Sequence, residues 1–166
     1  MKKKKNQKRS DVLKQKRDVE TLSFLTSWGL KNLYGGIDET FYKLAMVEVD
    51  YLAEIGLVQD ILSIKSMVDA IKSALNVEPC GNIGDFSNSI VALALGIAKH
   101  NDIKNMGLPV TWNEHLKKKL LKIFYPEEVR NKIFEWAKEN GFNTSTYLGQ
   151  PIIKFSKVFI LIERYV

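Results

Sequence analysis

Apolar residues recur at helical spacing along most of this chain, and that periodicity limits its fold more than any other feature of the sequence. Leucine, isoleucine, valine and phenylalanine return every three or four residues, as in helices that bury one face. Glycines and prolines interrupt the pattern where a helix would end. The sequence therefore predicts a mainly α protein, with about six helices in a single compact helical domain.

The predicted helices differ in how apolar they are. The helix over residues 86–99 is apolar nearly all round, so we expect it at the centre of the core. Ser10 and Asp85 are the expected N-caps of the first and fourth helices. The six predicted helices cover residues 10–34, 38–55, 59–75, 86–99, 111–124 and 126–140.

The C-terminal residues 150–166 fit two structures. Their apolar residues keep a heptad-like spacing, which indicates a terminal helix, whereas their β-branched and aromatic residues favour strands. The segment from Tyr147 to Pro151 has the glycine and proline of a hairpin turn. A terminal helix and a small C-terminal β-hairpin therefore both stay open.

Positive charge is concentrated at the N-terminus. The 166 residues carry a net charge of +6. Residues 1–17 hold nine lysines or arginines and one acid, Asp11, and so carry +8, whereas the remainder carries −2. We therefore divide the chain into a basic arm, residues 1–17, which leads into the first helix, and a helical body, residues 18–166.

An arm of this charge is typical of segments that bind nucleic acid through its phosphates. There are two alternatives for the arm: it is a solvated tail, or it is a patch that binds an anionic membrane or an acidic protein. Lysine outnumbers arginine in the arm, which favours phosphate contacts over reading of base sequence. The candidate contacts are Lys2, Lys3, Lys4, Lys5, Lys8, Arg9, Lys14, Lys16 and Arg17.

Two further surfaces are candidates for contacts. On the predicted helix over residues 111–124, the apolar side chains share one face and leave a second, weaker anion-binding stripe on the other. Phe24 and Trp28 lie four residues apart, away from the main apolar stripe of the first helix, and are candidates for stacking on bases or for a subunit contact. The lysines of the second stripe are Lys118, Lys119 and Lys122.

Residue types that carry catalysis or bind metals are scarce. The chain has two histidines, His100 and His115, and one cysteine, Cys80, with no further ligand at metal-binding spacing. The segment from Gly81 to Asp85 precedes a predicted helix but lacks the lysine of a phosphate-binding loop. We therefore expect that the protein has no catalytic residue, no metal and no cofactor, and that it is not an enzyme.

Together these features favour a non-catalytic structural subunit that packs along DNA or RNA in a larger assembly. A basic helical arm followed by a compact helical domain resembles, in architecture alone, the coat proteins of archaeal filamentous viruses and the small helical subunits of CRISPR surveillance complexes. The expected partners are nucleic acid, further subunits and other copies of the chain. Two alternatives stay open: a winged-helix-like DNA-binding regulator, and a protein–protein adaptor whose basic tail is incidental.

The sequence also bears on location. Its longest apolar run, residues 90–98 counting Gly96, is far shorter than the roughly 20 residues that cross a bilayer. Charged residues follow the basic start, where a signal peptide would be apolar. We therefore expect no membrane span, and an intracellular (cytoplasmic) protein or part of an intracellularly assembled particle.

Overall fold

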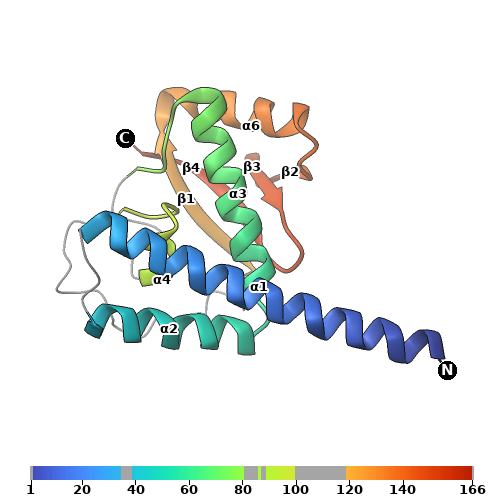
Figure 1. Ribbon diagram of the computed structural model, residues 1–166. Helices are drawn as coiled ribbons and strands as arrows, with labels where there is room; N and C mark the ends of the chain where they lie inside the picture. The colour runs from blue at the N-terminus through green and yellow to red at the C-terminus, as the bar shows by residue number, and fades with distance from the viewer. Residues whose placement is uncertain (1, 35–38, 81–85, 87–88, 100–118, 166) are drawn as a thin grey trace.

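The computed structural model describes residues 2–34, 39–80, 86, 89–99 and 119–165. In these ranges the chain is helix-rich and ends in a small four-stranded sheet (Figure 1), so the mainly α class is confirmed. The sheet is larger than a single hairpin. The elements are α1 (Lys2–Tyr34), α2 (Glu39–Glu54), α3 (Val58–Leu75), α4 (Ile90–Ala94), β1 (Leu120–Pro126), the 3-10 helix η2 (Glu127–Val129), α6 (Arg130–Glu139), β2 (Thr144–Tyr147), β3 (Gln150–Lys154) and β4 (Phe159–Tyr165).

Helices α2 and α3 match the helices predicted at these positions. The predicted inward residues Ala45 and Leu52 of α2 are fully buried. Gly56, with a φ of 76°, lies in the left-handed region between the two helices. Asn76 is also left-handed and donates its backbone N–H to the carbonyl of Lys72, which caps α3.

Helix α1 is longer than predicted, because it begins at Lys2 and not at Ser10. Lysine, glutamine and arginine are good helix formers, and no glycine or proline precedes Gly29, so the basic segment can continue the helix. Leu22 and Val12 both belong to the apolar stripe predicted for the first helix, but Leu22 is fully buried, whereas Val12 is 59% exposed. The early turns of α1 therefore lack the packing that holds the later ones.

Helices α1 and α4 approach each other closely at Gly29. A Cβ atom at this position would lie 1.9 Å from the carbonyl oxygen of Ala94. That distance is far inside van der Waals contact, so this crossing depends on the absence of a side chain. The glycine that sequence patterns would count against a helix is here what allows two helices to pack.

Helix α4 is much shorter than the helix predicted over residues 86–99. The N-cap is Ser89, whose Oγ accepts the N–H of Ala92 at 2.9 Å, while the predicted cap Asp85 lies outside the described residues. Gly96 has a φ of 75°, and this left-handed residue ends the helical segment early. The short helix is nevertheless well buried, because Val91 and Ala92 pack in the main core and Ile90 and Leu93 in a second, smaller cluster.

The four strands form a sheet in the order β1-β4-β3-β2. Strands β1 and β4 are parallel, and β3 is antiparallel to both β4 and β2. The register places alternate side chains of β1, β4 and β3 on one face, and that face joins the apolar residues of α3 and α6 in one buried cluster. The buried residues of this face include Leu121, Ile123, Tyr125, Ile153, Ile160 and Ile162.

Strand β1 corrects the prediction of a helix over residues 111–124. Residues 111–118 lie outside the described residues, but the segment from Leu120 onward is a strand. The tract around Ile123 and Tyr125 is β-branched and aromatic, and alternate side chains are buried against the core. Pairing with β4 therefore outweighs the helical spacing of apolar residues on which the predicted helix over residues 111–124 was based.

The C-terminal ambiguity resolves in favour of strands, so the terminal helix is wrong. Leu148 and Gly149 have φ values of 49° and 77°, and two positive φ angles at these positions are typical of the type I′ turn in a tight hairpin. The predicted sixth helix is present as η2 and α6, and Gly141, with a φ of 80°, follows its end. Among the described helices, none is both long and apolar enough to cross a membrane.

Two carboxylates from the helices hold backbone segments that follow much later in the sequence. Glu48 of α2 accepts the backbone N–H of Ile90 at 3.1 Å at the start of α4. Asp60 of α3, 2% exposed, accepts the backbone N–H groups of Ser156, Lys157 and Val158 between β3 and β4. Asp60 thus ties the helical part of the molecule to the sheet.

Candidate nucleic-acid interface

The basic arm forms about the first four turns of α1. Figure 1 shows the N-terminal end of this helix extending well beyond the other elements. At 1.5 Å per residue, the 33 residues of α1 span about 50 Å. All nine basic residues predicted to contact phosphates in the arm are exposed. The structure therefore gathers them on one rigid element.

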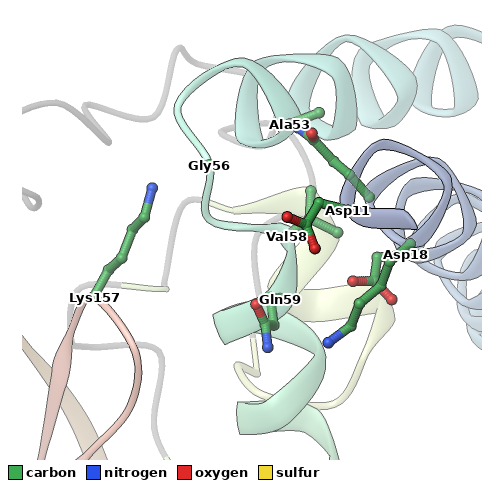
Figure 2. Close-up of a pocket in the computed structure, with 9 residues that line it drawn as sticks. Asp11, Asp18, Ala53, Gly56, Val58, Gln59 and Lys157 are labelled. Atoms are coloured by element: carbon green, nitrogen blue, oxygen red, sulfur yellow. The ribbon is translucent and has the colours of Figure 1, made fainter. Parts of the chain in front are cut away.

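The first two acids of α1 are turned toward the body. Asp11 and Asp18 line a hollow of about 370 Å³ between α1 and the turn before α3, together with Lys14 and Lys157. Figure 2 shows the Asp11 carboxylate directed into this hollow. Asp11 also accepts a hydrogen bond from Gln7 at 3.2 Å. Its charge therefore faces away from the outer side of α1.

The outer side of the arm carries basic residues without an acid. On a helical wheel, Arg9, Lys16 and Arg17 fall within about 100° of one another and lie opposite Asp11. Lys14 is the exception among the predicted contacts in this stretch, because it lines the hollow on the body side. The first two turns project beyond the body and expose their cations all round (Figure 1).

Phe24 and Trp28 are on the same outer side of α1. Their exposed fractions are 66% and 55%, so neither side chain is buried against the described body. Leu13, 57% exposed, lies on this side as well. We use the name outer ridge for the exposed row on α1 that consists of Arg9, Leu13, Lys16, Arg17, Phe24 and Trp28.

The second anion-binding stripe is not present as predicted. Lys118 lies outside the described residues. Lys119 has a φ of 55° and precedes β1, and Lys122 lies within the strand, so the two do not share a helix face. The helical spacing on which the stripe depended is absent over these residues, because strands have a period of two. Lys119 and Lys122 are exposed at the β1 edge of the sheet.

The residues considered for catalysis or metal binding do not form a site in the described part of the chain. Cys80 donates its backbone N–H to the carbonyl of Phe124 at 2.8 Å, and burial raises the pKa of its thiol, which disfavours the nucleophilic thiolate. His100 and His115 lie outside the described residues. Within the described ranges, no three histidine, cysteine, aspartate or glutamate side chains are grouped as metal ligands.

Sequence reasoning missed two properties of the interface. It began the first helix at Ser10, although residues 1–9 consist largely of helix formers without glycine or proline, which was a usable signal for a continuous helix. It also did not identify Leu13 as a contact residue, since an isolated leucine among basic residues is easily taken for core. The helical wheel, extended back through the arm, would have found both.

No protein-family model matches the chain, and no curated protein matches it either. The function is therefore argued from the geometry of α1.

Proposed function

We propose that this protein is a non-catalytic structural subunit that packs along DNA or RNA in a larger assembly. The basic residues of α1 bind phosphates without reading base sequence, and the body contacts neighbouring subunits, including other copies of the chain. The observation that carries the proposal is the concentration of nine exposed cations against one acid on residues 1–17, at the projecting end of one continuous helix.

A helix so densely charged gains from a polyanion. Lys4 and Lys8, and likewise Lys5 and Arg9, are like charges at positions i and i+4. Each such pair destabilises a helix by about 0.2–0.5 kcal/mol. Phosphates along α1 would relieve this repulsion, and their counterions would be released into solution. Both effects favour a long, regularly charged ligand over a small one.

The composition of the arm favours contacts that are independent of base sequence. Seven of its nine cations are lysines, which act as point charges on phosphates, and Arg9 and Arg17 alone have the bidentate geometry that reads guanine. We expect unrelated sequences of equal length to compete within about 100-fold of one another, which corresponds to about 2.7 kcal/mol.

A salt titration of affinity tests the proposal. The test variant carries glutamine at the four adjacent lysines Lys2, Lys3, Lys4 and Lys5. The slope of log K against log salt should become shallower by about 0.7–0.9 for each phosphate contact that is lost, hence by up to about 3–3.6 if all four lysines contact phosphates.

The matched control also removes four exposed lysines, but from the body, and so has the same net charge. It carries glutamine at Lys43, Lys132, Lys138 and Lys154. If the arm is the binding element, the control keeps the slope of the unmodified protein. Equal losses in both variants would mean that net charge, and not the arm, determines binding, and would overturn the proposal.

The winged-helix-like regulator is favoured by one observation, the tight hairpin of β2 and β3, whose tip exposes Leu148 at 87%. A winged-helix fold would use the helix predicted over residues 111–124, whereas residues 120–126 form strand β1, which weighs against this alternative. A preference well beyond 100-fold for one base sequence would support the regulator. An adaptor would instead purify without nucleic acid, as seen from absorbance at 260 nm.

A further inference from the structure

The outer ridge of α1 combines cations with exposed rings. Leu13, Arg17, Phe24 and Trp28 fall within about 60° of one another on the helical wheel, so they form one straight row. Both rings are more than half exposed. At 1.5 Å per residue they are about 6 Å apart along the axis, and the row from Arg9 to Trp28 spans about 28 Å.

A single acid lies beside the residues of the outer ridge. Glu20 is exposed, lies between Arg17 and Phe24, and is on the outer side of α1. A phosphate would be repelled there, although the cations that precede Glu20 attract phosphates. A nucleic acid that follows the ridge therefore has to present a different, uncharged part of itself to the turns that carry Phe24 and Trp28.

Resting on the function proposed above, we infer that the ligand of α1 is single-stranded nucleic acid, and that Phe24 and Trp28 stack on two of its unpaired bases. Unpaired bases offer apolar faces, and a base face is uncharged beside Glu20. A duplex has its base faces buried in its own stack and would have to be unstacked to cover these rings. Surfaces that bind single-stranded nucleic acid combine cations, which contact its sugar–phosphate backbone, with aromatic rings, which contact its bases.

The test compares a fluorescein-labelled oligo(dT) 15-mer with a hairpin duplex of mixed sequence, both titrated with the full-length protein. The variant is Phe24→Leu with Trp28→Leu, which keeps apolar side chains at both exposed positions but removes the rings. Affinity for the 15-mer should fall at least about tenfold, while affinity for the duplex stays unchanged. The salt slope should not change, because the same phosphates are contacted.

The matched control is Tyr147→Leu, which removes a ring that is 53% exposed on the β2–β3 hairpin, far from the ridge in the sequence. It should bind both probes like the unmodified protein. Intrinsic fluorescence gives a second readout. Oligo(dT) stacked on Trp28 should quench the emission of this tryptophan, and this quenching should be absent in the Leu variant.

The outcomes separate the two proposals. If the unmodified protein binds neither probe, the proposed function fails. If it binds and the double variant binds the 15-mer equally well, the function stands and stacking on single strands is wrong. If the variant keeps its affinity but loses self-association in sedimentation velocity, the two rings contact a second copy of the chain, and the inference is overturned.

Discussion

The two halves of α1 belong to one helix but meet opposite surroundings. Residues 2–17 are exposed and strongly basic, whereas Leu22, Thr26 and Leu30 of the second half are buried in the body. Packing of the second half fixes the direction of the first, because a helix once nucleated extends through good helix formers. The buried face of the second half is thus responsible for stability, whereas the first half has no such role and is free to serve binding.

The largest effect expected from this comparison is at Gly29. Gly29→Ala places a Cβ atom against the backbone of α4, 1.9 Å from the carbonyl oxygen of Ala94. We expect the free energy of unfolding to fall by about 2–3 kcal/mol, despite the higher helix propensity of alanine. Urea denaturation measures the change, and Asn32→Ala on an exposed position of α1 is the control. Equal stability of the two variants would contradict close packing in the second half.

A smaller loss is expected at Asp60, in the buried polar contacts of the body. Asp60→Ala removes the acceptor of three backbone N–H groups between β3 and β4. Leaving them without a partner should cost about 2 kcal/mol. Asp69→Ala, an exposed acid on the same helix, should cost much less. Equal melting temperatures of the two variants would contradict a stabilising role of the Asp60 hydrogen bonds.

A still smaller effect, with a dependence on pH, is expected at Glu78. Hydrogen bonds from Lys72 at 2.6 Å and Lys99 at 3.1 Å lower the pKa of this carboxyl below its usual 4.5. The group therefore stabilises the fold above about pH 4.5, and this contribution is lost as the pH falls through the lowered pKa. Because the group is largely exposed, the contribution should stay below about 1 kcal/mol. Glu78→Gln should remove the difference in melting temperature between pH 7 and pH 3 that this group causes, as scanning calorimetry can measure.

The smallest effect on stability is expected in the arm. Replacing Lys2, Lys3, Lys4 and Lys5 with glutamine should change the free energy of unfolding by less than about 0.5 kcal/mol, because no described contact of the body involves them. Circular dichroism during thermal unfolding is the measurement. A decrease of about 2 kcal/mol or more in the free energy of unfolding would mean that the first half of α1 also stabilises the fold, and would contradict the comparison.

The sequence predicted well those elements whose pattern and ends agree. In α3 the apolar spacing extends over the whole helix, and Asn76 adopts the left-handed conformation just beyond it. Gly141 likewise ends the sixth predicted helix as expected. Where the apolar periodicity and the residues that end a helix indicate the same boundaries, the local sequence is sufficient to predict the helix.

Reasoning from the sequence failed where distant parts of the chain decide the structure. Residues 120–126 form a strand because β4 pairs with them, and no local pattern reveals that partner. The early end of α4 has a local cause instead, because Gly96 adopts a left-handed conformation within an apolar run that continues past it. For the candidate site, the basic arm was predicted from composition, but the orientation of Asp11 toward the body required the structure.

The place of β4 has a consequence for synthesis on the ribosome. It follows every other strand in the sequence, yet it lies inside the sheet, between β1 and β3. Leu120 has no partner on this side until Phe159 has left the exit tunnel. Until then β1 presents an unpaired edge, the kind of surface on which nascent chains aggregate. The helices can pack while translation continues, but a ribosome that stalls after β1 leaves a chain that depends on chaperones.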